Sequence, residues 1–561
     1  MLKHLCFFVL LLLPGLTQAQ DSGLPLQAPT IHLLGRMEVL SGIPSMIHPE
    51  VGEISRRDAA NYARSIDTLA KFQGKVDRAN LQYIFDDNND CLPDSFCRKS
   101  RKSLLKYFYR TPANFFEVNT PDFTLRANPM FNFQLGDQNG DPELLFQNQR
   151  GLEVRGTVDD KVYFYTNLVE SQMRFPDYVT NRIQQFSAVP GAGFYKNYRP
   201  RFPKVTNAYD FNVANAVVGF HVTRHVGIQL GHGRNVIGNG YRSLFLSDVG
   251  NPYFFLKINT RVWRFQYQNL FMELSPGTAN TLNTSERIPR KYAAVHYLNY
   301  KVTPRLSFGF FEATIFNRSR DFEFQYLNPV ILYRTVEGMI GSPDNVQIGV
   351  DGHWNLFNRV QLYGQFLLDE FIFSQVVNPD QDGWWGNKFA FQSGIKYYNA
   401  LGINNLDVQL EYNSVRPYTY SHFDSLNSYT HYNQPLAHPL WSNFREMVAL
   451  VRYQPLPRLT LQARLLQATV ADDPVGENWG NIPLLGNASR SQEYGNEIGQ
   501  GIRARLRIIG LDATWMLHHN LFVEGKLMLR RKDSDDNALD LNTRVLALGI
   551  RMNMWNKEYD F

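Results

Sequence analysis

The feature that most constrains this fold is an alternation of apolar and polar side chains with a period of two residues, from Phe123 to the C-terminal region. In residues 406–413, LDVQLEYN, leucine, valine and tyrosine alternate with acidic and amide residues. Residues 458–466 and 521–531 repeat this pattern. Successive side chains of a β-strand point to opposite faces, so each segment predicts a strand with one apolar and one polar face.

Strand length and loop length distinguish a membrane barrel from a soluble β-sandwich, whose strands also alternate. The predicted strands are about 10–15 residues long, which is enough to cross a bilayer at a tilt. Tight connections such as 223–225 and 303–305 alternate with long ones. The long connections comprise residues 176–213, 317–344, 417–444 and 472–499. Short periplasmic turns that alternate with long outer loops are typical of outer-membrane barrels.

About eighteen strands can be placed by this pattern, an even number with both chain ends on the periplasmic side. They lie near residues 123–136, 149–157, 161–175, 214–223, 225–234, 253–259, 261–275, 290–302, 305–316, 345–355, 358–371, 387–399, 404–416, 445–454, 457–471, 500–517, 520–532 and 542–555. Such a sheet can close on itself and leave no free edge. The predicted fold is therefore all-β, a transmembrane antiparallel β-barrel. The aromatic C-terminal residue Phe561, here after a short polar tail, also suits a barrel.

The N-terminal region does not follow the barrel pattern. An apolar stretch that ends in the small residues Thr17 and Ala19 predicts a secretory signal peptide over residues 1–19. Residues 20–118 are then expected to form a small helical periplasmic segment, and residues 119–561 the barrel. Ser55 and Asp58 resemble a capping box, and apolar residues recur after them at helical steps.

Two cysteines remain after the signal peptide, Cys91 and Cys97. In an exported protein they predict a disulfide. The same stretch, FDDNNDCLPDSFC, places oxygen-bearing side chains at alternate positions, as calcium sites do. The candidate calcium ligands are Asp86, Asn88, Asp90 and Asp94. The alternative is a solvated acidic turn closed by the disulfide. No other cofactor is predicted.

The glycine-rich stretch 231–248 resembles a phosphate-binding loop but lacks the required spacing. Val236 stands where a dinucleotide fingerprint needs its third glycine, and no lysine follows Gly238 as a P-loop requires. We interpret it as an outer loop that folds against the barrel wall or inward into the lumen, where Arg234, Arg242 and Asp248 pair with one another. Its alternative role is ligand contact, for which the candidates are Arg234, Asn235, Tyr241 and Arg242.

Further candidate ligand contacts lie in the aromatic outer loops. Aromatic faces stack on sugar rings, while tyrosine, asparagine and histidine reach hydroxyls. The candidates are Trp384, Trp385, Tyr418, Tyr420, His422, His431, Tyr432, Asn433 and Trp441. The two adjacent tryptophans could instead belong to the aromatic girdle of a barrel. The polar aromatic loop around His431 could instead be a folded lid over the lumen.

Several classes of function are disfavoured. The formal net charge of +5 gives no reason to expect a nucleic-acid partner. No histidine stands beside a convincing serine nucleophile and orienting acid, so we expect no enzyme activity. A diffusion channel remains the main alternative to a binding protein, because barrels of ~16–18 strands can hold an aqueous pore. The long loops and the N-terminal helical segment favour an occluded lumen.

Long stretches of this sequence resemble the capsule-assembly outer-membrane protein (Wzi-like) family. They are GRNVIGNGYRSLFLSDVGNPYFFLKI, EFQYLNPVILYRTVEG, RPYTYSH and HYNQPLAHPLWSNFRE. They are most similar to its branch in Bacteroidetes-type bacteria, whose members are linked to gliding motility. The resemblance implies an eighteen-stranded barrel with a periplasmic helical bundle that holds capsular polysaccharide at the cell surface.

From this resemblance and the predicted barrel we expect an outer-membrane location with loops exposed at the cell surface. The expected partners are outer-membrane lipid and lipopolysaccharide, surface polysaccharide, the barrel-assembly machinery during biogenesis and motility proteins.

Overall fold

The computed structural model describes residues 22–561 with several internal gaps. Residues 46, 101–106, 202, 279, 281–287, 319–322, 342–343, 371–373 and 375–381 are not among those described. The predicted signal peptide, residues 1–19, also lies outside the described residues.

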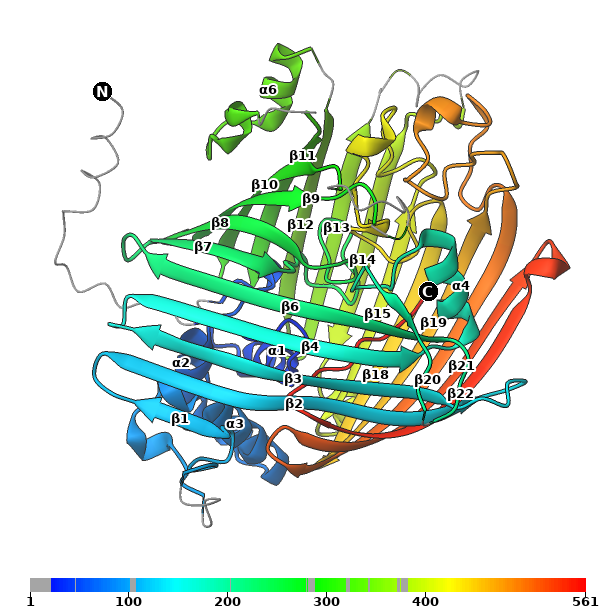
Figure 1. Cartoon of the computed structure of the whole chain (residues 1–561). Coiled ribbons are helices and arrows are strands. Elements are labelled where there is room, and N and C mark those ends of the chain that lie inside the picture. The colour runs from blue at the N-terminus through cyan, green and yellow to red at the C-terminus, as the bar shows by residue number, and fades with distance from the viewer. Residues whose placement is uncertain are drawn as a thin grey trace.

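The protein is a closed antiparallel β-barrel (Figure 1). The main sheet contains 20 strands, of which β1 and β5 are short additions, so eighteen form the wall. The wall strands are β2 (Phe123–Gln138), β3 (Leu145–Val158), β4 (Val162–Arg174), β6 (Ala208–His221), β7 (Val226–Gly233), β8 (Tyr253–Val262), β9 (Phe265–Leu274), β10 (Lys291–Thr303), β11 (Leu306–Phe316), β12 (Asn345–Leu356), β13 (Val360–Glu370), β14 (Lys388–Tyr397), β15 (Leu406–Val415), β18 (Phe444–Leu456), β19 (Leu459–Asp472), β20 (Ile502–His518), β21 (Leu521–Ser534) and β22 (Leu541–Met552).

The barrel closes where its first and last wall strands pair. β2 and β22 run antiparallel, from the pair Phe131 and Met552 to the pair Gln138 and Val545. Every wall strand coincides with one predicted from the alternation, and the largest shift is at β6, which begins six residues early, at Ala208 rather than 214. The predicted fold class is confirmed.

Smaller elements complete the chain. The described helices are α1 (Pro29–Ser41), α2 (Arg56–Asp67), α3 (Lys75–Asp87), α4 (Asp177–Phe186) and α6 (Tyr333–Met339). β1 (Phe116–Asn119) pairs with β2, β5 (Lys196–Tyr198) pairs with β6, and β16 (Thr430–His431) pairs with β17 (Gln434–Pro435). Among the helices that the structure describes, none is both long and apolar enough to cross a membrane.

The two faces of the wall differ as the alternation predicts. On neighbouring strands β20 to β22, exposed apolar side chains point outward, namely Ile509, Leu511, Trp515, Val523, Leu529, Leu546, Leu548 and Ile550. Charged and polar side chains of the same strands face inward and are buried, among them Glu524, Arg530 and Arg551. An exposed apolar surface this continuous suits lipid rather than water.

The N-terminal segment begins its second helix as the sequence predicts. The Ser55 side chain accepts a hydrogen bond from the backbone N–H of Asp58 and caps α2. The predicted apolar stripe of this helix is buried at Ala59, Tyr62 and Ile66.

The N-terminal segment is attached to the barrel wall. It lies at one end of the lumen (Figure 1) and contacts wall strands through buried polar groups. The Glu50 carboxylate bonds His353 on β12, Glu53 pairs with Lys257 on β8, and Asp90 pairs with Arg155 on β3.

Cys91 and Cys97 both lie in the short stretch of chain that follows α3. Cys91 ends a short 3₁₀ helix, Asn89–Cys91, and the Sγ of Cys97 lies 3.4 Å from the carbonyl oxygen of Asn89. The disulfide stays a prediction.

Replacing both cysteines with serine is expected to speed proteolysis near residues 86–97. A bridge across so short a loop stabilises by at most roughly 2–3 kcal/mol, and the barrel wall is closed by its own ladder. Heat-resistant migration on gels should therefore not change. Reductant-treated wild-type protein is the control and should be cleaved as fast as the variant. Free thiols in protein isolated without reductant would contradict the bridge.

Candidate functional site

Four chain segments fold into or over the lumen. They are the N-terminal segment (residues 22–115), the loop 234–252 between β7 and β8, the loop 416–443 between β15 and β18, and the tail 553–561 after β22. The backbone N–H of Gly238 in the second segment donates to the carbonyl of Glu50 in the first, at 2.7 Å. The Tyr420 hydroxyl of the third donates to the carbonyl of Leu244 in the second, at 2.8 Å. The segments therefore support one another across the lumen.

The loop 234–252 is held to the wall by a buried ionic network centred on Arg242. The Arg242 guanidinium lies 3.0 Å from the Glu446 carboxylate of β18 and donates to the carbonyl of Asp560, at 2.7 Å. The Glu411 carboxylate of β15 accepts the backbone N–H groups of Tyr241 and Arg242. These contacts agree with the interpretation as a salt-bridged plug loop.

The prediction that Arg234, Arg242 and Asp248 pair with one another is wrong, because each has other partners. Arg242 pairs with Glu446 rather than Asp248, and Arg234 donates to the carbonyls of Gly250 and Gly191. Asp248 instead accepts a hydrogen bond from Gln27, at 2.9 Å. A residue-by-residue pattern cannot find such partners, because Arg242 and Glu446 are distant in sequence and meet only when the barrel closes.

The C-terminal tail, which carries Phe561, turns inward. β22 ends at Met552, and the tail then enters the lumen, where Figure 1 places the C-terminus. Arg464 on β19 holds Glu558 and Asp560 at 2.9 and 3.0 Å. The guanidinium of Arg182 lies 4.1 Å from the centre of the Phe561 ring. No local pattern in the tail indicated this course.

The loop 416–443 forms a lid. Tyr418, Tyr420, His422, His431, Asn433 and Trp441 are all buried, and Tyr432 is half-buried. Their polar groups contact protein: His431 accepts the N–H of Ser275 and Asn433 donates to the carbonyl of Phe186. Burial lowers the pKa of the His431 imidazole to about 3, so this ring is neutral at physiological pH. These contacts favour the lid interpretation over sugar stacking.

Trp384 and Trp385 form a different surface, which we call the tryptophan platform together with Arg490 and Glu493. Both indole N–H groups donate to the same carboxylate oxygen of Glu493, at 3.3 and 2.9 Å. The Arg490 guanidinium lies 4.5 Å from the Trp385 ring and also pairs with Glu493. The two tryptophans are half-buried and stand in an outer loop next to β14.

The platform joins two outer loops that are far apart in sequence. The backbone N–H of Gly495 donates to the carbonyl of Asp382, and that of Asn496 donates to Gly383, both at 2.9 Å. Both indoles therefore contact the neighbouring outer loop, residues 473–501.

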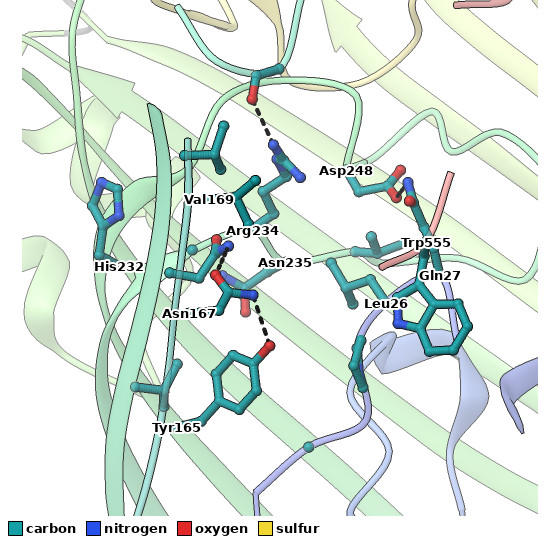
Figure 2. Close-up of a pocket in the computed structure, with 18 of the residues that line it drawn as sticks. Leu26, Gln27, Tyr165, Asn167, Val169, His232, Arg234, Asn235, Asp248 and Trp555 are labelled. Carbon is teal, nitrogen blue, oxygen red and sulfur yellow. Dashed lines mark hydrogen bonds between the residues drawn. The ribbon is translucent and has the colours of Figure 1, made fainter. Parts of the chain in front are cut away.

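An internal cavity of about 290 Å³ lies between the wall and the plug segments (Figure 2), and we call it the amide cavity. Tyr165 and Asn167 of β4 line its wall side, while Arg234 and Asn235 approach from the loop (Figure 2). Leu26, Gln27, Asp248 and Trp555 border it on the plug side. Further wall residues are Gln147, Gln149, Asn215, Gln229 and Lys257. A second cavity of about 570 Å³ lies among the N-terminal segment, the loop and the tail.

Only Arg234 and Asn235 of this cavity lining were among the predicted site residues. The wall amides alternate with outward residues as in any lumen face, so their clustering gives no signal in sequence. It arises because β3, β4, β6 and β7 are neighbours in the barrel.

The candidate calcium ligands contact arginines instead of one another. Asp86 pairs with Arg98, Asp90 pairs with Arg155, and the Asn88 side-chain oxygen accepts from Arg56 at 3.0 Å. The side chain of the fourth candidate, Asp94, lies outside the described part of the structure. Across the described part of the chain, no group of three His, Cys, Asp or Glu side chains could hold a metal ion. These ion pairs weigh against calcium, which stays an untested hypothesis.

No family model and no curated protein matches this sequence. Solved structures match the fold. Wzi, an outer-membrane protein involved in group 1 capsule assembly in Escherichia coli and described as a carbohydrate-binding β-barrel, aligns with a TM-score of 0.57 at 14% identity. The alignment covers 96% of this chain and 100% of that one. OprD of Pseudomonas aeruginosa aligns with a TM-score of 0.41 at 10% identity over 76% of this chain and 92% of that one.

At these identities the likeness concerns the fold alone. The fold is that of a bacterial outer-membrane barrel, and the outward apolar surface described above agrees with an outer-membrane location.

Proposed function

We propose that this protein is a non-enzymatic outer-membrane barrel that binds surface polysaccharide, capsule or exopolysaccharide, with its outer loops. The tryptophan platform carries the proposal. Half-buried indoles at an outer surface can stack on sugar rings, and Arg490 and Glu493 beside them can bond hydroxyl or carboxylate groups. The likeness in fold to a carbohydrate-binding barrel supports the same reading.

The occupied lumen supports a binding protein over a diffusion channel. Four segments fold into or over the lumen, and buried ion pairs such as Arg242–Glu446 and Lys257–Glu53 hold two of them to the wall. Moving such a segment out of the lumen costs free energy, because each buried charge would lose its partner.

The resemblance to the motility-linked branch adds a finer proposal, in which the bound polysaccharide serves surface gliding and the outer loops also meet motility proteins. A clean gene deletion separates the two roles. Lost surface polysaccharide with normal spreading supports a capsule role, and lost spreading with normal polysaccharide supports motility.

Replacing Trp384 and Trp385 with alanine is expected to weaken binding of purified cell-surface polysaccharide at least about fivefold. Loss of stacking on two rings corresponds to roughly 1–3 kcal/mol, and 1.4 kcal/mol is tenfold in affinity. Isothermal titration with the detergent-solubilised full chain measures the change. The matched control is Trp263→Ala, an exposed tryptophan in the tight β8–β9 turn at the opposite end of the barrel. Equal weakening by both variants would sink the assignment to the platform.

A further inference from the structure

The charges that line the amide cavity do not balance. Three cations, Arg234, Lys257 and Lys557, face it with two carboxylates, Glu53 and Asp248. Lys257 and Glu53 form an ion pair with each other. If all five groups are charged, the lining therefore carries one positive charge in excess.

Among the described residues, Arg234 and Lys557 donate hydrogen bonds only to backbone carbonyl groups. Arg234 donates to Gly250 at 2.9 Å and to Gly191 at 2.6 Å, and Lys557 donates to Val249 at 3.0 Å. Burial, followed by the neighbouring Arg234, holds the pKa of the Lys557 ammonium well below its usual range, and the nearby Asp248 carboxylate offsets only part of this effect. An anion bound between the two cations would relieve this repulsion and favour the charged ammonium.

The opposite wall of the cavity carries side chains that can form hydrogen bonds with the hydroxyl groups of a ligand. Tyr165, Asn167 and Asn215 form a chain of hydrogen bonds, with the Asn167 amide donating to the Tyr165 hydroxyl at 2.9 Å and the Asn215 amide donating to Asn167 at 2.9 Å. Gln229 is 1% exposed, and its side-chain oxygen has no hydrogen-bond partner in the described structure. A ligand hydroxyl that reached this oxygen would supply the missing donor.

The cavity volume and its one indole limit the ligand to a small ring. About 290 Å³ is near the lower end of ligand pockets, roughly 300–1,000 Å³. Trp555 borders the cavity on the plug side (Figure 2) and offers an aromatic ring next to the polar wall.

We propose that the amide cavity binds one acidic sugar unit, a hexuronate, with its carboxylate between Arg234 and Lys557 and its hydroxyls on the wall amides and Gln229. The choice of a sugar rests on the proposed function, whereas the preference for a single negative charge rests on the cavity lining alone. The cavity site is separate from the tryptophan platform, which lies in the outer loops.

Isothermal titration of the full-length protein in detergent tests this site with glucuronate, glucose and acetate as probes. Glucuronate is expected to bind at least tenfold more tightly than glucose or acetate. Equal affinity for glucuronate and glucose, or no binding of glucuronate, would overturn the proposal. Acetate that binds as tightly as glucuronate would also overturn it, since the hydroxyl contacts would then contribute nothing.

Variants then locate the site. Lys557→Met is expected to weaken glucuronate binding at least tenfold, while Lys396→Met should leave it unchanged. Lys396 is a matched control because its ammonium also donates to a backbone carbonyl, that of Asn239, but it lines only the second cavity, whereas Lys557 borders both. Equal effects of the two variants would refute the location. The comparison among probes on wild-type protein needs no variant, so misfolding of Lys557→Met leaves the test intact.

The two proposals fail separately. The variant without Trp384 and Trp385 should lose polysaccharide but keep glucuronate. Loss of glucuronate binding in that variant would contradict a separate internal site.

Discussion

A chain that lacks both the N-terminal segment, residues 22–115, and the loop 234–252 is expected to conduct ions steadily in planar bilayers, and the full-length protein is not. Eighteen strands enclose a lumen wide enough for an aqueous channel when nothing fills it. The lumen face is polar, with buried side chains such as Lys257, Gln365 and Glu411 that water would solvate once the plugs are gone.

The loop can be shortened because its ends already meet. Gly233 and Tyr253 are paired in the β7–β8 ladder, so a two-residue turn can join them. The two single deletions are the controls, and each should conduct less than the double deletion because one plug remains.

Heat-resistant migration on gels shows whether each shortened barrel has folded. A large steady conductance from the full-length protein would contradict the plugged lumen and favour the diffusion channel. A folded double deletion without conductance would show that the tail and the loop 416–443 alone close the lumen.

Replacing Arg242 with methionine is expected to free the loop 234–252 from the wall. The change leaves the Glu446 carboxylate, 1% exposed, with His438 and Asn413 but without its guanidinium partner. Removing one partner of a buried ion pair costs about 3–5 kcal/mol. The loop should therefore open at least about a hundredfold more often, since 1.4 kcal/mol is tenfold in a ratio of states.

Hydrogen exchange measures this opening. The backbone N–H groups of Tyr241 and Leu244 donate to Glu411 and Gln365, at 2.6 and 2.8 Å, and both should exchange faster in the variant. The matched control is Arg290→Met, which breaks a partly exposed pair with Glu273 that is worth at most about 1 kcal/mol. Unchanged protection of Tyr241 in the Arg242 variant would contradict the anchoring role.

The sequence predicted the wall closely because the signal for a wall strand is local. Leu546, Leu548 and Ile550 face outward whatever the rest of the chain does, once lipid and lumen lie on the two sides. The predicted strand ends differ from the observed ones at the rim of the barrel, where side chains no longer face lipid, as at the start of β6. The capping residue Ser55 was also a local signal and was confirmed.

Hydrophobic periodicity did not mark the first helix, α1, because its buried residues do not lie on a single face. In α1, the charged residues Arg36 and Glu38 are buried along with Leu33 and Leu34. Arg36 reaches Asp77 and Asn399, and Glu38 holds Ser45. A helix enclosed by a polar lumen has no polar outer face, so no amphipathic pattern marks it.

The candidate site residues also differ in how much of their role a local sequence pattern could predict. Aromatic and polar loops were predicted to fold as a lid or to bind sugar, and their burial now favours a lid for the loop around His431. Trp384 and Trp385 both bond Glu493 of a second outer loop, and no local sequence pattern indicated which loop that would be.

By itself, then, the sequence determined the class of fold, the number of wall strands and which face of each strand meets lipid, because alternation and turn length are properties of neighbouring residues. Only the tertiary structure decided what occupies the lumen. Arg242 finds Glu446, and Arg464 finds Asp560, across distances in sequence at which local patterns carry no information. Closing the barrel brings these charges together away from water, and there the need to pair each buried charge selects the course of the loop and of the tail.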